Sequence, residues 1–363
     1  MNLHHLHTPA GKPRARSLGI EVAGKPGPFN AITDVAGVEV GYTTLISGSG
    51  PLVRGKGPVR TGVTAILPRG KKLASVPCSA GSYSFNGSGE MTGLLWIEES
   101  GELSTPITIT NTHSCGVTRD ATIEWMIESG NGTVTDYGLP VAAETYDGEL
   151  NDLNGFHVTR EHTIAALESA SSGPMEQGSV GGGTGMICYD FKAGSGTASR
   201  VVSVDSVEYT LGCFVQANFG RRPELVVMGR NVGREMPGGE LRGKPAGSII
   251  VVIATDAPLL PHQLKRLARR VPIGMARTGA IGHNGSGDIF LAFSTANLEA
   301  YQGRSRSMEF IANPRMDDLF AATADAVEEA ILDSMIVNET MVGANGNVCV
   351  GIPRDKLTAL LGL

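Results

Sequence analysis

The pattern of apolar and polar positions along the chain predicts more strands than helices. Runs of four or more residues that are apolar, or that alternate between apolar and polar, are typical of strands. Several of these runs are apolar on both faces, which indicates sheets covered on each side by another layer. Seven runs stand out, at residues 32–44, 62–67, 106–112, 200–204, 224–228, 248–255 and 289–294.

Helical periodicity is clear in fewer places. At 264–271, apolar residues recur at i, i+3, i+4 and i+7, and lysine and arginine occupy the other face. A longer stripe runs through 317–340, with Asp317 and Asp318 at its favourable N-terminal end. Two shorter helices are expected at 118–129 and 161–170.

Strands covered on both faces, with few helices outside them, predict a layered sandwich of the α/β/β/α or α/β/α kind. Length alone would suggest two domains, but no Pro/Ser-rich linker separates two halves of the 363 residues. We therefore expect one domain over residues 1–363.

Composition and charge exclude several classes of partner. The net charge is −6 and the basic residues form no large cluster, which argues against nucleic acid. No apolar run approaches the roughly 20 residues of a membrane span, and the N-terminus lacks the apolar stretch of a secretory signal. The five cysteines are scattered and include no C-x-x-C pair, as expected for free thiols in a reducing cytoplasm.

Familiar catalytic and ligand motifs are missing or incomplete. The stretch GSVGGGTG at 178–185 lacks the P-loop lysine and is followed by no helical pattern, so a turn is favoured over a nucleotide site. HHLH at 4–7 has no nearby carboxylate, and no metal site is expected. There is no G-x-S-x-G, S-x-x-K or H-E-x-x-H motif. A hydrolase would need something other than a histidine-based triad.

Ser248 offers such an alternative. It stands where the flexible segment GKPAG meets the apolar run IIVVIA. If the chain broke between Gly247 and Ser248, the new α-amine, with a pKa of about 7.7–8.0, would lie beside the hydroxyl and act as its base. Serine also often opens an ordinary strand. The residues alone leave both interpretations open.

Longer segments add a resemblance to a known family. ITDVAGVEVGY (32–42), TNTHSCG (110–116), GSVGGGTGM, FVQANFG (214–220), GSIIVVIATDAPLLPHQL and GHNGSGDIFLAFSTAN (282–297) resemble the self-cleaving aminopeptidases of the DmpA type. That family includes L-aminopeptidase/D-esterases and β-peptidyl aminopeptidases. The resemblance implies an αββα sandwich like that of N-terminal-nucleophile hydrolases but differently connected. It also implies self-cleavage into chains 1–247 and 248–363, and tetramers of cleaved pairs.

The resemblance also implies roles for individual residues. Ser248 would be the nucleophile, and Ser286 and Asp288, two apart on one strand, would relay its proton and stabilise its amine. Asn218 would donate to the oxyanion, as would the hydroxyl of Tyr146. Glu144 would bind the substrate's free ammonium group. Some relatives have glutamate in place of Asp288, so the shorter side chain reaches less far.

These observations predict a cofactor-free hydrolase that releases small L-, D- or β-amino acids from peptides, amides or esters through an acyl-enzyme on Ser248. A transferase of the ornithine acetyltransferase type is an alternative, although that group has threonine at the break. An uncleaved binding protein on the same fold is another. A dinucleotide-binding enzyme is disfavoured because no helix follows GSVGGGTG.

Overall fold

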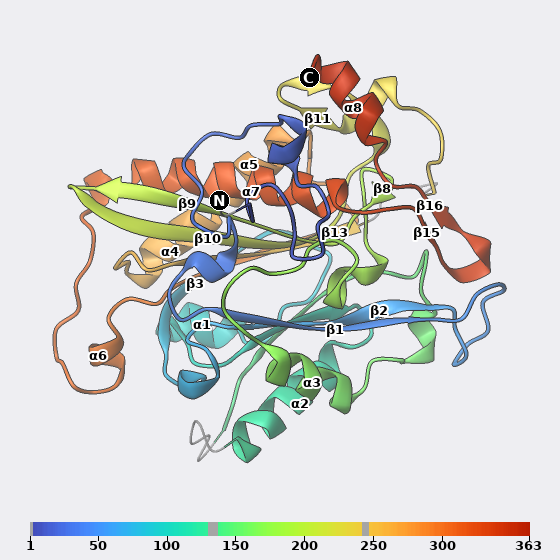
Figure 1. The fold of residues 1–363 in the computed structure, drawn as a ribbon. Helices are drawn as coiled ribbons and strands as arrows, with labels where there is room; N and C mark the ends of the chain where they lie inside the picture. Colours follow the sequence, from blue (N-terminus) through green and yellow to red (C-terminus); the bar gives the residue numbers. More distant parts are fainter. Residues whose placement is uncertain (1–2, 130–136, 242–246) are drawn as a thin grey trace.

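Two β-sheets face each other between two layers of helices (Figure 1). The computed structural model describes residues 3–129, 137–241 and 247–363. This four-layer arrangement confirms the predicted αββα sandwich.

The smaller sheet has the strand order β1-β2-β5-β6, and only its β5–β6 pair is parallel. The larger sheet has the order β4-β3-β14-β13-β10-β9, and only its β13–β14 pair is parallel. The strands of the smaller sheet are β1 (Glu39–Ser47), β2 (Val59–Leu67), β5 (Ile107–Asn111) and β6 (Val141–Thr145). Those of the larger are β3 (Cys78–Gly87), β4 (Glu102–Leu103), β9 (Ser195–Val204), β10 (Val207–Asn218), β13 (Gly247–Thr255) and β14 (Ser286–Ser294).

Helices cover the outer face of each sheet, and short hairpins close the ends. The helices are α1 (Leu94–Ser100), α2 (Cys115–Glu128), α3 (Arg160–Ser169), α4 (Pro261–Ala268), α5 (Val271–Arg277), α6 (Leu298–Tyr301), α7 (Asp317–Ile336) and α8 (Arg354–Leu361). The hairpin strands are β7 (Ile187–Cys188), β8 (Phe191–Lys192), β11 (Val226–Val227), β12 (Arg230–Asn231), β15 (Met341–Val342) and β16 (Val348–Cys349).

The side chains of β13 show why its sequence is apolar throughout. Ile249, Val251 and Ile253 pack against the outer helices, including α4, α5 and α7. Ile250 and Val252 face the smaller sheet. Because successive side chains of a strand point to opposite faces, a strand buried on both sides has no polar face. By the same alternation, the side chain of Ser248 points toward the space between the two sheets.

The predicted elements agree with the structure where the pattern is strong. The stripe at 264–271 corresponds to α4, and the stripe at 317–340 to α7, which ends at Ile336. Two predicted strands, 32–44 and 224–228, were wrong in part, although residues 39–44 do belong to β1. Residues 32–38 form a short 3₁₀ turn and a loop before β1, and 224–228 contains only the two-residue β11. Both segments contain apolar residues that fill core positions from a loop rather than a ladder.

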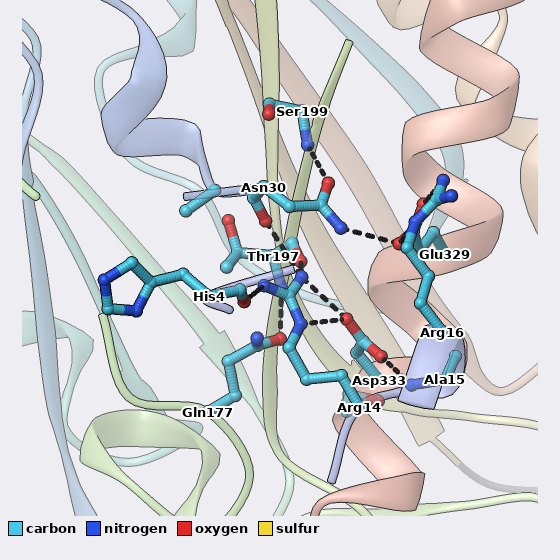
Figure 2. A network of polar contacts seen from close by, with 12 residues as sticks. His4, Arg14, Ala15, Arg16, Asn30, Gln177, Thr197, Ser199, Glu329 and Asp333 are labelled. Carbon is cyan, nitrogen blue, oxygen red and sulfur yellow. Dashed lines mark hydrogen bonds and ion pairs between the residues drawn. The ribbon is translucent and has the colours of Figure 1, made fainter. Parts of the chain in front are cut away.

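A network of buried charges fixes the N-terminal segment against α7 (Figure 2). Arg14 donates to Asp333 at 2.7 Å, and Arg16 and Arg200 each donate to Glu329 at 2.6 Å. The amide of Asn30 adds a further bond to Glu329. Since an unpaired buried charge is costly, each partner is required once the others are in place.

Other sequence features have structural roles. GSVGGGTG contains a buried 3₁₀ turn, Gly181–Gly185, and no α-helix follows it directly. Among the described residues no group of histidine, cysteine and carboxylate side chains is arranged to hold a metal, and no helix has the length and hydropathy to cross a membrane. All five cysteines are buried free thiols.

Candidate active site

Ser248 lies near the start of β13, in the middle of the larger sheet, and is almost fully buried. Its hydroxyl donates to the carbonyl oxygen of Gly247 at 2.7 Å. The main-chain N–H of Gly287 donates to the same hydroxyl oxygen at 3.3 Å. The hydroxyl is therefore held beside the peptide bond that precedes it.

Strand register places three of the relevant residues in one row. Asn218, at the end of β10, is the antiparallel partner of Ser248, and Gly287 of β14 is its parallel partner. Partners in register point to the same face of a sheet. Asn218 and Ser248 thus share the face toward the smaller sheet.

Gly247 adopts a backbone conformation that requires glycine. Its φ is +154°, and a Cβ at this position would lie 2.1 Å from the main-chain oxygen of Asn218. Main-chain atoms of a central sheet cannot move aside, so no larger residue fits. The peptide before Ser248 is consequently packed tightly and has no side chain to shield its carbonyl.

Ser286 and Asp288 contact each other on the opposite face of the larger sheet. The Ser286 hydroxyl donates to Oδ1 of Asp288 at 2.6 Å. Their side chains point to the same face of β14 as that of Phe290, which packs against the outer helices. No hydrogen bond joins either side chain to the Ser248 hydroxyl in the described structure, because that hydroxyl lies on the other face.

Burial raises the pKa of Asp288 to about 6, although the Ser286 hydroxyl, His283 and the N–H of Ile249 all favour the ionised form. Its Oδ2 is buried and has no hydrogen-bond partner among the described residues. A small cavity of about 10 Å³ opens beside the pair, and His283 lines it as well. His283 is held by Glu224 at 2.9 Å. A carboxylate with a spare buried oxygen is suited to receive a new positive charge.

Glu144, near the end of β6, is a buried carboxylate and not an ordinary surface glutamate. It accepts hydrogen bonds from the N–H of Glu90, at 3.0 Å, and from the hydroxyl of Thr112. Burial raises its pKa. A Cβ on Gly89 would lie 3.0 Å from Oε1 of Glu144 and 3.1 Å from Cα of Gly287. Gly89 thus lies close to both Glu144 and Gly287, the residue whose N–H contacts Ser248.

Asn218 and Tyr146 connect the ends of β10 and β6. The side-chain amide of Asn218 donates to the main-chain oxygen of Tyr146 at 2.7 Å, and its Oδ1 accepts the N–H of Ile187 at 2.9 Å. Tyr146 is 39% exposed. The orientation of the amide is thus determined, with its donor end on the side of β6.

Sequence reasoning missed two parts of the surroundings. One part is the His283–Glu224 pair: His283 lies in the segment GHNGSGD and was a visible signal, whereas Glu224 is distant in the sequence. The hairpin of β7 and β8, which supplies the Ile187 N–H, gave no signal because its strands have only two residues each.

A buried serine hydroxyl held against a main-chain carbonyl, on an αββα sandwich, is the kind of group that a serine hydrolase uses as its nucleophile. Residues 30–349 match peptidase family S58. The β-peptidyl aminopeptidase BapA of Sphingosinicella microcystinivorans is 53% identical, over 96% of this chain and 92% of that protein. BapA of Sphingosinicella xenopeptidilytica is 45% identical, over 96% and 91%.

Solved structures agree with this assignment. The L-aminopeptidase D-Ala-esterase/amidase of Ochrobactrum anthropi, described as a prototype for the serine aminopeptidases and a variant of the Ntn hydrolase fold, superposes with a TM-score of 0.91. It is 47% identical, over 97% of this chain and 98% of that one. A Burkholderia sp. β-aminopeptidase gives a TM-score of 0.87 at 45% identity, over 96% and 98%.

The chain belongs to peptidase family S58. It is a serine-type aminopeptidase, as the resemblance implied. The transferase, dinucleotide-enzyme and binding-protein alternatives are not favoured by these relatives.

Proposed function

We propose that the chain cleaves itself between Gly247 and Ser248 and then acts as an aminopeptidase whose nucleophile and base are both parts of Ser248. One observation carries this proposal: the hydroxyl of Ser248 donates to the carbonyl oxygen of Gly247, with 2.7 Å between the two oxygens. A serine hydroxyl that is held against the preceding peptide bond is already positioned to attack that bond. The reaction therefore takes place within one chain.

In the cleavage step, Oγ of Ser248 bonds to the carbonyl carbon of Gly247 and the C–N bond breaks. The proton of the hydroxyl passes to the departing nitrogen, and an ester joins the two residues. Water then hydrolyses the ester, which leaves a carboxylate on Gly247 and a free α-amine on Ser248. The products are chains 1–247 and 248–363 within one folded unit.

The register suggests how Ser286 and Asp288 join the site after cleavage. Gly247 is the β14 partner of Ser286, so its displacement would clear the space beside that hydroxyl. The nitrogen of Ser248 lies within the sheet, between the two faces, and a free amine can rotate toward Ser286. The Asp288 carboxylate would then stabilise the protonated amine through Ser286.

Hydrolysis of a substrate follows from these positions. Oγ of Ser248 attacks the substrate carbonyl while the α-amine accepts its proton. The amide of Asn218 and the hydroxyl of Tyr146 stabilise the oxyanion. The proton passes to the leaving amine, and water attacks the acyl-enzyme by the same route in reverse. No step calls for a metal or a cofactor.

The substrate is proposed to be a small peptide, amide or ester with a free amino group. Glu144 supports this choice, because a buried carboxylate close to the serine pairs with an ammonium group and excludes blocked N-termini. The relatives named for β-peptides and for L- and D-amino acids make all three classes candidates.

We also propose that the cleaved pairs assemble as a homotetramer in the cytoplasm. Exposed Val342 and Val348 on the β15–β16 hairpin support an interface, and five free cysteines support a reducing compartment. Light scattering of the purified protein tests the first point.

Denaturing electrophoresis with N-terminal sequencing tests the main proposal. We expect two fragments, the smaller one beginning at Ser248. An intact wild-type chain that still hydrolyses alanine p-nitroanilide would refute the role of the α-amine. Adding a competing acceptor amine separates hydrolysis from transfer, since a transferase is nearly idle without its acceptor.

A further inference from the structure

Lys192 is a buried lysine next to the candidate oxyanion group. It has no measurable exposure, and its Nζ donates to the main-chain oxygens of Met186, at 3.1 Å, and Ala193. Within residues 3–129, 137–241 and 247–363, no carboxylate forms an ion pair with it. Burial lowers its pKa to about 7.

An unpaired lysine in a core is unfavourable compared with an apolar side chain of the same length. Packing alone therefore does not explain why a lysine occupies position 192. The two carbonyl groups that Lys192 binds indicate its role.

One of these carbonyls belongs to the peptide that orients Asn218. The oxygen of the Met186–Ile187 peptide accepts from Lys192, and the N–H of the same peptide donates to Oδ1 of Asn218 at 2.9 Å. A hydrogen bond to the oxygen of a peptide polarises its N–H and fixes the plane of the peptide. Lys192 thus acts on Asn218 through a single peptide group.

The hairpin that carries Lys192 is held rigidly. Its two turn residues, Tyr189 and Asp190, both have positive φ, at 52° and 57°, as a two-residue turn of this kind demands. Arg222 donates to the oxygen of Tyr189 at 2.9 Å and stacks on Phe191. The N–H of Tyr189 donates at 2.7 Å to the oxygen of Phe219, the residue after Asn218. Backbone held in sparsely populated conformations commonly occurs where a site needs exact positioning.

We propose that Lys192 is a positioning residue for the oxyanion amide, acting through the Met186–Ile187 peptide on Asn218. This inference rests on the proposed function, in which Asn218 donates to the oxyanion. Lys192 contacts neither the substrate nor Ser248, so its removal affects the turnover rate and leaves substrate binding unchanged.

The test is a double-mutant cycle with Lys192→Met and Asn218→Ala, measured on alanine p-nitroanilide with rates expressed per cleaved chain. We expect Lys192→Met to lower kcat about tenfold with KM unchanged, and Asn218→Ala to lower it about 100-fold. The double variant should equal Asn218→Ala alone, because a residue that acts only through Asn218 has no further effect once that amide is gone.

A matched control is Tyr189→Phe in the same hairpin. It removes the hydroxyl contact with Thr278 and keeps the peptide that holds Asn218, so kcat should stay within twofold of wild type. Lys192→Leu is measured in parallel, so that a folding defect of one variant does not decide the result. If cleavage itself becomes slow, the same comparison is made on the cleavage rate.

Additive losses in the double variant would overturn the inference, as would wild-type kcat in both Lys192 variants. An Asn218→Ala enzyme with wild-type kcat would refute the oxyanion role of Asn218 and this inference together. The self-cleavage proposal would be unaffected, because it is read independently from the fragments on a denaturing gel.

Discussion

Gly287 donates its main-chain N–H to the hydroxyl oxygen of Ser248 across the β13–β14 pair, at 3.3 Å. With the hydroxyl proton directed to Gly247, the oxygen is anchored on both sides before any reaction takes place. The two bonds come from main-chain groups of one sheet, so the geometry is inherited from strand register and does not depend on a mobile loop.

Replacing Ser248 by alanine is expected to leave a single intact chain and no detectable aminopeptidase activity, because both cleavage and acyl transfer use the same oxygen. Denaturing electrophoresis and hydrolysis of alanine p-nitroanilide measure the two effects. Ser294→Ala is the control on the neighbouring strand, since that hydroxyl bonds to Ala257 at the far end of the sheet. Fragments in the Ser248→Ala protein would contradict the assignment.

Gly247→Ala is expected to destabilise the uncleaved chain by about 3 kcal/mol or more and to slow cleavage. The added Cβ would overlap the main-chain oxygen of Asn218. Chemical denaturation in a Ser248→Ala background measures the first effect without interference from cleavage. Gly116→Ala in α2, where a Cβ meets no atom within 4 Å, should be neutral or stabilising. Equal stabilities for the two alanine variants would refute the steric argument.

Asp288 is expected to give the uncleaved chain a pH-dependent stability. Its pKa is raised from 3.8 to about 6, so the fold favours the protonated form. The stabilising effect is complete below about pH 4 and is lost as the pH rises through 6. Asp288→Asn, which stays neutral, should therefore stabilise the Ser248→Ala chain at pH 7 by about 3 kcal/mol and have little effect at pH 4. Thermal unfolding at the two pH values checks the sign.

The same substitution is expected to lower activity, because the proposed role of Asp288 needs its charge. In the cleaved wild type the neutral α-amine of Ser248 is the base, so kcat should fall as the pH drops through the pKa of that amine. Asp288→Asn removes the charge that stabilises the protonated amine, so the variant should lose at least tenfold in kcat at pH 7 and its acidic limb should move to lower pH. A variant that is more stable and equally active would remove Asp288 from the mechanism.

Glu144→Gln is expected to reduce kcat/KM for alanine p-nitroanilide about 100-fold, mainly by raising KM. Glutamine keeps the size of the side chain and loses the charge that pairs with the substrate's ammonium group. The rate of self-cleavage provides the comparison, because that reaction involves no ammonium group of a substrate. A similar loss in the self-cleavage rate would indicate a structural role.

The strongest sequence patterns predicted the fold because they reflect burial. The apolar run of β13 requires cover on both sides and the stripe of α7 requires cover on the face that carries it, and the structure provides both. Strand β3 was missed because serine and glycine occupy many of its positions, β6 because it has only five residues, and β10 because polar residues interrupt its apolar pattern. Their stability comes from neighbours that are distant in the sequence.

The candidate site was predictable only where the residues form compact segments. Ser248 follows a visible change from polar to apolar residues, and Ser286 and Asp288 are two apart, so their contact follows from strand geometry. The face on which that pair lies could not be predicted, because it depends on the register between β13 and β14. The hydrogen bonds of Asn218 depend on a hairpin far away in the sequence.

Glu329 is expected to be essential for stability. Glu329→Gln leaves Arg16 and Arg200 without their counter-charge in the core, which should cost about 3–5 kcal/mol. Urea denaturation of the Ser248→Ala chain measures the loss. Glu299→Gln, at an exposed pair with Arg304, is the control and should change stability by less than about 1 kcal/mol.

The buried charges of Figure 2 divide along the proposed break: the carboxylates of Glu329 and Asp333 lie beyond Ser248, and the arginines that pair with them lie before it. If the two pieces were synthesised separately, each would have to bury charges of one sign without their ion-pair partners. Making both as one polypeptide and cutting it only after folding avoids that difficulty, so a gene divided at this codon should yield far less active enzyme than the continuous one.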